Sequence, residues 1–293
     1  MSETVRSDNP PISVYIRTKN EARLIAKVVS SALQIGREVV VVDSGSTDGT
    51  IDLAKAAGAR VIEHSWSGNG HQKRFAEEQC QFDWLLDLDG DEIMPQKLAD
   101  EIRGLFAHGE PSCSVYKTPM AIVPPVGSPW LSFGLQRRTK LYDRRKIRMP
   151  EHMYWDQFEI PPGTPVGKLT EPLLHSAVGD AHHLMNKLNQ HSTQRANIES
   201  TRSTFVIIIR IILGLPVYFL KRYLFEGLFR GGVYGFAYAL MTAFRRWLVD
   251  VKMYEKRKSH DPSINHDQAI DEDETTLTKS ADVSAGLPRD PKV

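Results

Sequence analysis

Four acidic residues crowd one short segment of the chain. Asp87, Asp89, Asp91 and Glu92 lie within six positions, and Gly90 separates the middle pair. Carboxylate oxygens are the ligands that Mg²⁺ and Mn²⁺ prefer, and these ions bridge readily to substrate phosphates. A bound dication would relieve the repulsion between the carboxylates, and the small Gly90 would let a diphosphate approach the backbone. The alternative interpretation is an acidic turn that only caps the helix after it.

A second polar segment runs from Asp43 to Thr50. Asp43 can accept hydrogen bonds from a nucleobase imide or a ribose hydroxyl, and Gly45 permits a tight turn. The alternative is helix capping, in which Asp48 satisfies the free amides of the next helix. Both roles can hold together, with Asp48 as the cap and Asp43 as the ligand. No dinucleotide-binding G-x-G-x-x-G follows a predicted strand and no G-K-[ST] occurs, which weakens the dehydrogenase and NTPase interpretations.

Two further segments carry polar residues at comparable places. Arg17 to Glu21 follows the first apolar run, although capping by Asn20 alone could explain it. His71 to Arg74 brings basic side chains, among them Lys73, that could face a diphosphate. For each of those four residues taken singly, a solvated helix face is the alternative.

These segments are positioned by alternating strands and helices from Ile12 to about Ala107. The apolar runs predict strands at 12–17, 38–43, 60–64 and 83–88, and the periodicity predicts helices at 21–33, at 51–57 and over a stretch ending near Cys80. Such alternation indicates a parallel sheet with right-handed crossovers. Ligands bind beyond the carboxyl ends of the strands in such sheets, so the polar segments should share one edge.

The second half of the chain has a looser pattern. Pro119 to Pro129 is rich in proline and apolar residues and predicts a long loop near a binding cleft. Arg137 to Arg148 contains seven basic residues. Asp180 to Arg202 predicts a polar helix, and Phe205 to Trp247 is apolar and aromatic.

Bulk composition excludes several classes. The chain has 293 residues and a net charge of +1, and a dedicated nucleic-acid binder would carry a marked basic excess. The two cysteines, Cys80 and Cys113, form no metal-ligand or redox pattern. The N-terminus lacks the apolar run of a signal peptide, so we expect a cytoplasmic protein. Residues 1–11 and the acidic segment 259–293 are predicted to be disordered.

Three motifs together resemble the family-two inverting glycosyltransferases of the GT-A fold. They are Thr18-Lys19-Asn20-Glu21, the run Val41 to Thr50, and Leu88-Asp89-Gly90-Asp91-Glu92. The subgroup that looks most similar is the WaaE/KdtX-like lipopolysaccharide core glucosyltransferases. The resemblance extends through Gly68, Gln72 and Lys73 to Leu174-His175 and Lys187-Leu188-Asn189. It implies a GT-A catalytic domain over 12–180, with a mostly parallel central sheet flanked by helices and a C-terminal helical appendage over 181–258.

The resemblance also implies roles for individual residues. The donor would be a UDP-sugar, by resemblance UDP-glucose, held with Mg²⁺ or Mn²⁺. Asp89 and Asp91 would coordinate the metal, and the nucleotide would contact Thr18, Asn20, Glu21 and Asp43.

Where relatives carry a His-Glu pair, this chain reads Trp155-Asp156. Asp156 is therefore the candidate general base, which would take the proton of the acceptor hydroxyl during a single inverting displacement. Partial burial beside Trp155 would raise its pKa toward that use. The alternative is a surface residue in a variable loop. A second departure, Gly134 to Arg137, falls where the acceptor should bind and leaves the acceptor open.

The predicted function is transfer of a sugar to a lipid-linked or lipopolysaccharide-core acceptor. Three alternatives remain open: a polyprenyl-phosphate sugar synthase, a catalytically inactive scaffold of the same fold, and a nucleotidyltransferase. A nucleotidyltransferase would release pyrophosphate instead of a nucleoside diphosphate. The sequence does not indicate an oligomeric state.

The C-terminal region predicts contact with a membrane. Phe205 to Leu220 has 16 residues, fewer than the roughly 20 that span a bilayer, and Arg210 interrupts it. Residues 221–258 hold nine basic and three acidic residues, interleaved with aromatics. This pattern is typical of helices lying in the interface of an anionic leaflet, which predicts peripheral attachment to the cytoplasmic face of the inner membrane. A helical cap on the catalytic domain or an oligomer contact is the alternative.

Overall fold

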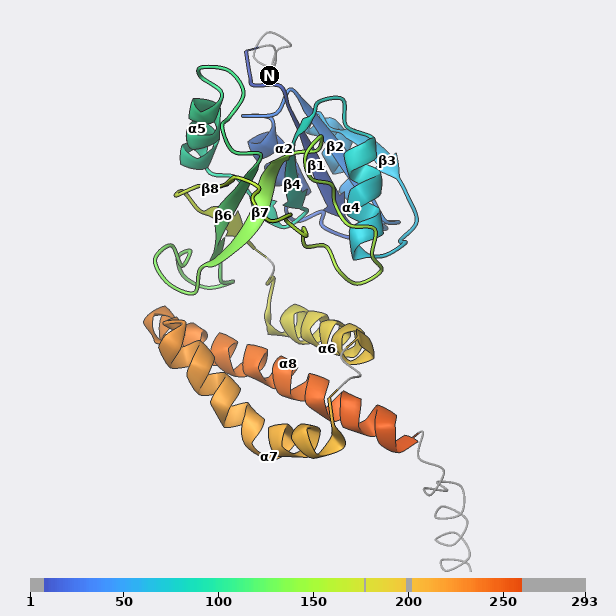
Figure 1. Cartoon of the computed structure of the whole chain (residues 1–293), viewed down its shortest axis with the longest axis vertical. Coiled ribbons are helices and arrows are strands. Elements are labelled where there is room, and N and C mark those ends of the chain that lie inside the picture. Colours follow the sequence, from blue (N-terminus) through green and yellow to red (C-terminus); the bar gives the residue numbers. More distant parts are fainter. Residues whose placement is uncertain (1–7, 177, 199–201, 260–293) are drawn as a thin grey trace, which may run out of the picture.

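The computed structural model of the chain describes residues 8–176, 178–198 and 202–259. A sheet with helices packed on it forms the upper part of the molecule in Figure 1, and the C-terminal helices lie below it. The predictions of disorder for residues 1–7 and 260–293 fall outside the described residues, and Ser259, the first residue of the predicted tail, is the last residue of a helix instead. At residues 8–11 the expectation of disorder was wrong, because the buried Asn9 side chain donates hydrogen bonds to the carbonyls of Leu33 and Gly36.

The first half of the chain forms the predicted parallel sheet. Its strands lie in the order β3-β2-β1-β4, all parallel. Strands β1, β2 and β4 are almost entirely buried because both faces of the sheet are covered there. The bounds are β1 (Ile12–Thr18), β2 (Glu38–Asp43), β3 (Arg60–Glu63) and β4 (Trp84–Asp89), with helices α2 (Ile25–Ala32), α3 (Thr50–Ala56) and α4 (Asn69–Glu78) between them.

Helix α2 begins four residues later than its periodicity predicts. Side chains of the second polar segment bind the preceding backbone instead, because the N–H of Glu21 donates to Thr50 Oγ1 and that of Ala22 donates to Asp48. These bonds tie the segment that begins at Arg17 to the second polar segment, Asp43 to Thr50.

The second half of the chain extends the sheet in mixed directions. Strand β7 pairs antiparallel with β4 and β6, and β6 pairs parallel with β8 and β9. The loop predicted from Pro119 was wrong in its first part, because Pro119 to Ile122 belongs to strand β6 and pairs on both sides. The bounds are β5 (Glu92–Ile93), α5 (Gln96–Leu105), β6 (Val115–Ile122), β7 (Gln136–Asp143), β8 (Val166–Lys168) and β9 (Leu173–His175).

The core lies on both faces of the sheet. Ile12, Val14 and Ile16 of β1 pack on one face, while Tyr15 packs on the other, as strand alternation requires. Burial of these side chains fixes the register of β1 and therefore the position of the residues that follow it.

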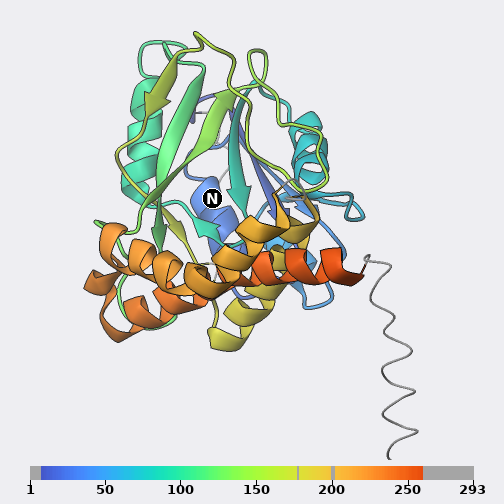
Figure 2. The same ribbon diagram turned by 60° about the horizontal axis from the view of Figure 1, so that its bottom comes forward.

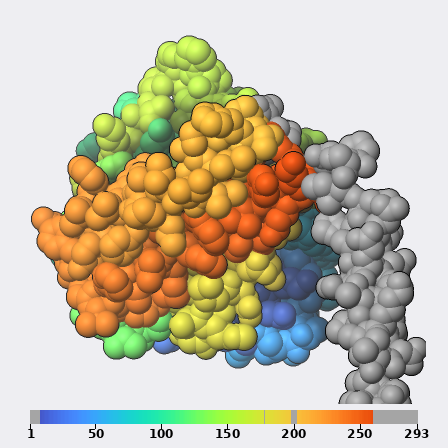
Figure 3. Space-filling view, turned by 90° about the horizontal axis from the view of Figure 1, so that it is seen from below, coloured from blue at the N-terminus to red at the C-terminus, as the bar shows by residue number. Residues whose placement is uncertain are grey.

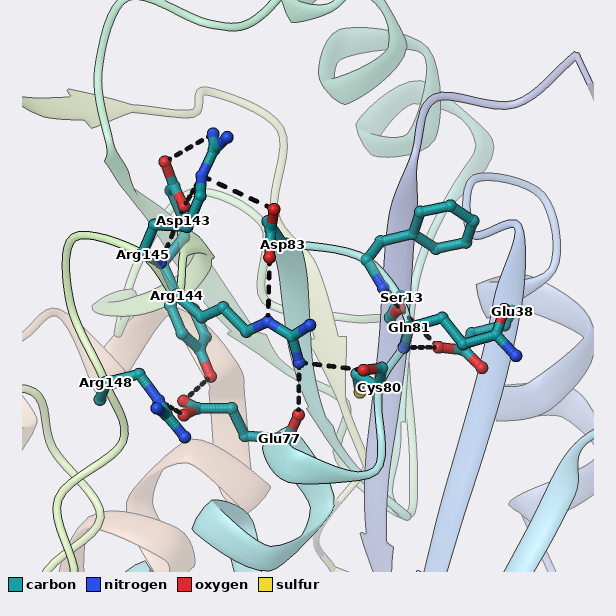
Figure 4. A network of polar contacts seen from close by, with 12 residues as sticks. Ser13, Glu38, Glu77, Cys80, Gln81, Asp83, Asp143, Arg144, Arg145 and Arg148 are labelled. Carbon is teal, nitrogen blue, oxygen red and sulfur yellow. Dashed lines mark hydrogen bonds and ion pairs between the residues drawn. The ribbon is translucent and has the colours of Figure 1, made fainter.

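A network of charged side chains stabilises the edge of this sheet at the start of β4, opposite the edge that faces the C-terminal helices (Figure 4). Glu77 of α4 is fully buried and accepts hydrogen bonds from the Tyr142 hydroxyl at 2.7 Å and the Met149 amide at 2.9 Å. Arg148 donates to the same carboxylate. Arg144 donates to Asp83 and to the carbonyls of Glu77 and Cys80.

The C-terminal region consists of three helices. They are α6 (Ala181–Ile198), α7 (Thr204–Leu220) with its continuation η1 (Lys221–Phe225), and α8 (Gly232–Ser259), which follows the short η2 (Leu228–Gly231). Figure 2 shows α7 and α8 side by side across the end of the sheet. Asp250 of α8 fixes the pair, since it accepts hydrogen bonds from Arg210 and from the Tyr218 hydroxyl.

Helix α7 is longer than the sequence predicts. It continues through η1, so the stretch Thr204–Phe225 has 22 residues and, by length and composition, could cross a membrane. The expectation that the segment is too short was therefore wrong. Arg210 donates to Asp250 of α8, whereas Phe205 and Ile212 remain 72% and 69% exposed. Figure 3 shows α7 and α8 covering the lower face of the molecule.

Candidate functional site

Three of the polar segments meet at one edge of the sheet. They are Arg17 to Glu21, Asp43 to Thr50 and Asp87 to Glu92. In the register of the strands, Arg17 lies opposite Asp89, and Thr18 lies opposite Asp43. The sheet order β2-β1-β4 makes these strand ends neighbours, as parallel pairing predicts.

A cavity of about 780 Å³ opens above this edge. Its floor comes from the strand ends and the turn after β4, and its wall comes from α6. We call it the donor cavity, after the sugar donor that the sequence leads us to expect. The lining residues used below are Arg17, Thr18, Asn20, Glu21, Asp89, Asp91, Asp156, His175 and Lys187.

Asp43 differs from the other predicted nucleotide contacts because it lies beneath this cavity. Its side chain is fully buried and is absent from the cavity lining, whereas Ser44 lines it. Asp43 Oδ1 accepts from the amides of Gly45 and Ser46, and Oδ2 accepts from the Ser46 hydroxyl. In this conformation Asp43 shapes the loop and presents no free oxygen to a ligand.

Asn20 and Thr18 both line the donor cavity, but they differ in the hydrogen bonding of their side chains. Asn20 has a left-handed backbone, with φ of 53°, and its amide oxygen accepts from the Thr47 amide. The Thr18 hydroxyl is buried and has no hydrogen-bond partner among the described residues. Its oxygen lies 2.6 Å from where a Cβ on Gly90 would be, so a side chain at position 90 would displace it.

Glu21 is the acidic side chain of the cavity whose charge is least stabilised. Burial, with the nearby Asp91 carboxylate, raises the pKa of Glu21 to about 7. The carboxyl is thus divided between its protonated and ionised forms near neutral pH, and a cation in the cavity would favour the ionised form.

Asp89 lies between two cations. Its Oδ1 is 2.9 Å from Arg17 Nη2 and 3.3 Å from Lys73 Nζ. Burial opposes ionisation of Asp89, but Arg17 and Lys73 outweigh it and hold its pKa well below the ordinary value. Lys73, predicted to face a diphosphate, is only 3% exposed and also pairs with Asp87 at 2.9 Å.

Asp91 has a second set of partners. Lys187 Nζ of α6 donates to its Oδ2 at 3.0 Å, and His175 Nε2 lies 3.4 Å from its Oδ1. Burial opposes ionisation here too, but His175 and Lys187 keep the pKa of Asp91 well below its usual range. Asp91 Oδ1 is buried and has no hydrogen-bond partner among the described residues.

These pairs correct the premise that a dication is needed to hold the carboxylates together. Lys73, Lys140 and Lys187 already neutralise them, and Lys140 Nζ lies 2.6 Å from Glu92. A buried carboxylate is tolerated when it is paired and hydrogen-bonded, whatever the source of the positive charge. Repulsion within the acidic segment is therefore no argument for a metal.

Asp156 reaches the same site from a distant loop. Its Oδ2 is 3.5 Å from Lys73 Nζ and 3.6 Å from Arg17 Nη2. The expectation of a raised pKa was wrong. Burial would raise the pKa of Asp156, but Lys73 and Arg17 lower it below the ordinary value.

Gly68 and Gly70 allow the loop that carries Asp156 to lie against α4, because a Cβ at either position would meet backbone atoms of that loop. The amides of Asn69 and Gly70 donate to the carbonyls of Met153 and His152. A Cβ on Gly70 would come 2.5 Å from the Trp155 carbonyl and 2.8 Å from the His152 amide. Only glycine fits there, so this contact fixes the path of the chain just before Asp156.

Asp156 also lines a second cavity of about 300 Å³, which we call the acceptor cavity. Asp89, Asp156 and His175 line both cavities, so these side chains form their junction. The rest of the acceptor cavity comes from Lys73, Asp87, Glu92, Lys117, Met120, Gln136, Arg137, Arg138, Thr139, Lys140, Gln157, Phe158 and Ile160.

Four site residues were not assigned a role from the sequence. Arg17 could have been identified, because it immediately precedes Thr18 at the end of a strand. Lys140 lies within a run of bases that gives no indication of which one turns inward. His175 and Lys187 belong only to the outlying part of the resemblance, and no local pattern indicates that they meet Asp91.

The residues present fit a divalent ion if substrate supplies part of its coordination. Among the described residues no group of three His, Cys, Asp or Glu side chains could hold an ion alone. Mg²⁺ is often bound by one or two carboxylates together with substrate phosphates. Asp91, whose Oδ1 accepts no hydrogen bond from the described residues, and Asp89 are the carboxylates available in the donor cavity, and His175 is the adjacent nitrogen donor.

Comparisons with known proteins agree with this geometry. The family model for glycosyl transferase family 2 matches residues 13–165. A glycosyltransferase of Rickettsia typhi, RT0209, is 32% identical over 83% of this chain and 87% of its own length. The lipopolysaccharide core biosynthesis glycosyltransferase LpsC of Rhizobium meliloti is 30% identical over 87% of this chain and 98% of its own length.

A solved structure shares a smaller part of the fold. Glucosyl-3-phosphoglycerate synthase from Mycobacterium tuberculosis, in complex with Mn²⁺, UDP and glucosyl-3-phosphoglycerate, is 27% identical over 40% of this chain and 46% of that chain. Its TM-score is 0.32, and a likeness at that level does not assign a ligand to this protein.

A mixed sheet whose strand ends carry paired carboxylates at a ligand-sized cavity defines a transferase of the GT-A type. The chain belongs to glycosyl transferase family 2.

Proposed function

We propose that the protein transfers a sugar, with UDP-glucose as the donor, to a lipid-linked acceptor and inverts the anomeric centre. The observation that carries the proposal is the junction of the two cavities at Asp156. A single displacement requires the leaving group and the attacking hydroxyl on opposite sides of the sugar. The donor diphosphate would lie beside Asp89 and Asp91, and the hydroxyl would enter from the acceptor cavity.

The donor would be held by charged side chains and by close contact between its diphosphate and the backbone at Gly90. Thr18, Asn20 and Glu21 line the part of the cavity that would receive the nucleoside, and Lys187 and Arg17 face the part that would receive the diphosphate. A divalent ion held by Asp89 and Asp91 would stabilise charge on the leaving diphosphate. Lys187 adds fixed positive charge at Asp91, which costs no reorganisation during the reaction.

Asp156 would accept the proton of the acceptor hydroxyl. Lys73 and Arg17 keep its carboxylate ionised at neutral pH, so it is ready to accept a proton. They also make it a weaker base than a carboxylate in an apolar site. The same two cations hold Asp89 and Asp156 in a fixed relation across the junction.

The test is release of UDP from UDP-glucose by purified protein with Mn²⁺. Asp91→Ala should abolish the release, because it removes the carboxylate whose Oδ1 accepts no hydrogen bond from the described residues. Asp100→Ala is the matched control, since Asp100 is exposed on α5. Unchanged release by Asp91→Ala would contradict the metal assignment. Release of pyrophosphate in a second assay, from UTP and glucose 1-phosphate, would identify a nucleotidyltransferase instead.

We further propose that α7 and α8 attach the protein to an anionic membrane surface, on the cytoplasmic face, where a lipid-linked acceptor is available. Their exposed apolar side chains support this, and basic residues flank them. The relative LpsC is described as acting in lipopolysaccharide core biosynthesis, which fits an acceptor of that kind. Exposed apolar residues of the pair include Phe205, Ile209, Ile212, Val217, Phe225 and Val233.

Sedimentation with phosphatidylglycerol vesicles tests this attachment. Ile212→Asp should reduce binding about tenfold or more, because it puts a charge into the apolar face. Leu53→Asp, on the exposed side of α3, is the control and should bind as the wild type does. Equal binding by Ile212→Asp would contradict the membrane surface, and concentration-dependent dimerisation lost in that variant would indicate an oligomer contact. Mass spectrometry of glycolipids from cells with and without the gene would identify the sugar.

A further inference from the structure

The acceptor cavity contains two zones of different charge. Its inner zone adjoins Asp156 and contains only paired charges. Lys73 lies 2.9 Å from Asp87, and Lys140 lies 2.6 Å from Glu92. All four of these side chains are at most 5% exposed. Because each buried cation faces a carboxylate, the inner zone is close to neutral and suits a hydroxyl-bearing sugar.

The outer zone carries positive charge without matching carboxylates. Arg138 and Lys117 line it, and neither side chain has a hydrogen bond or ion pair within the part of the chain that the structure describes. Gln136 lines it as well and likewise has no partner there. Gln136 and Arg138 share one face of β7, and a bulge in its pairing with β6, between Tyr116 and Lys117, interrupts the alternation before Lys140.

The neighbouring Arg137, unlike Arg138, has a hydrogen-bond partner within the described part of the chain. Arg137 also lines the cavity, but its guanidinium donates to the Leu169 carbonyl at 2.8 Å. Its guanidinium therefore supports the connection between β8 and β9. Arg138 has no such structural partner, and it lies at the mouth of a cavity that leads to Asp156.

We propose that the acceptor carries an anionic group, a phosphate or a carboxylate, which binds Arg138 and Lys117 while the attacking hydroxyl lies at Asp156. This proposal rests on the proposed function, since it deepens the specificity of the same site. A guanidinium binds both anions through paired N–H donors, and Gln136 can add a further donor. Arg138 is thus a specificity-determining residue of the acceptor cavity.

The experiment measures binding of glucose 6-phosphate, glucuronate and glucose to the full chain by NMR titration, with the donor cavity saturated by UDP and Mn²⁺. At least one anionic sugar should bind about tenfold more tightly than glucose, as a charge-assisted contact provides. Arg138→Gln should remove that preference, and Arg138→Lys should restore part of it. Lys55→Gln, an exposed lysine on α3, is the control and should retain it.

Each possible result of these titrations either supports the proposal or overturns it. A phosphate-only or carboxylate-only preference that depends on Arg138 supports the proposal and identifies the anion. Equal affinity for all three sugars overturns it, as does a preference that survives Arg138→Gln. A preference present only without UDP also overturns it, because the anion would then occupy the donor cavity. UDP affinity is measured in the same samples, so failure of the proposed donor site is seen separately.

Discussion

The basic residues at the two ends of strand β7 have opposite surroundings. After its C-terminal end, Arg144, Arg145 and Arg148 each contact carboxylates, as Figure 4 shows. Near its start, Arg138 has no partner among the described residues and lines the acceptor cavity. These residues belong to one basic run in the sequence. Their partners, not their type, separate the charges that stabilise the fold from those free to bind a ligand.

The largest effect on catalysis is expected at the junction of the cavities. Asp156→Asn removes the proton acceptor and should lower sugar transfer by about 10²–10⁴-fold. UDP affinity should stay within about threefold, because Lys73 keeps Asp87 and Asp89 as partners. Transfer assays and UDP titrations measure the two separately. Full transfer activity in this variant would show that another group takes the proton.

The largest effect on stability is expected at the structural end of β7. Glu77→Ala leaves the buried Tyr142 hydroxyl and Met149 amide without their acceptor, and Arg148 without a charge partner. We expect a loss of about 3–5 kcal/mol in the free energy of unfolding, measured by urea denaturation. Glu78→Ala is the control, because Glu78 is 52% exposed, and it should change stability by less than about 0.5 kcal/mol. Similar losses of stability in both variants would contradict the structural role of the buried Glu77 carboxylate.

A third prediction concerns the contact between α4 and the loop that carries Asp156. Gly70→Ala forces this loop away from α4, because its Cβ would meet backbone atoms of Trp155 and His152. A displacement near 1 Å should cost about 10²-fold in transfer rate. Gly104→Ala on α5 is the matched control, since nothing lies within 4 Å of its Cβ. That variant should keep its activity and gain up to about 1 kcal/mol in stability.

The smallest expected effect compares the two ends of β7 directly. Arg144→Gln loses its bonds to Asp83 and to two backbone carbonyls, so stability should fall by about 1–3 kcal/mol. Arg138→Gln breaks no bond and should change stability by less than about 0.5 kcal/mol. Urea denaturation of the two variants side by side measures the difference. Equal losses would mean that Arg138 has a structural role.

Local pattern was enough to predict the strands around the site. The apolar runs of β1, β2 and β4 are buried on both faces, so burial fixes their bounds and brings Thr18 and Asp89 to one edge. Helix α2 was misplaced because Asp48 and Thr50 bind the backbone before it, which is a tertiary contact. Pro119 was misread because proline is rare within a paired strand.

Charges were harder to predict than strands. Asp43 has the position of a ligand at a strand end, but its own loop uses both of its oxygens. The pKa of Asp156 moves down because Lys73, distant in sequence, lies beside it. A sequence shows that a carboxylate is present, but the direction of its pKa shift depends on partners that only the fold brings near.

Titration of the wild-type protein and Asp91→Ala with UDP, with and without Mn²⁺, tests the donor site most directly. The wild type should bind UDP at least about tenfold more tightly with Mn²⁺ than without it, and Asp91→Ala should lose that gain. If UDP binds equally with and without Mn²⁺, or if Asp91→Ala keeps the full gain, a metal-held diphosphate at Asp91 is contradicted.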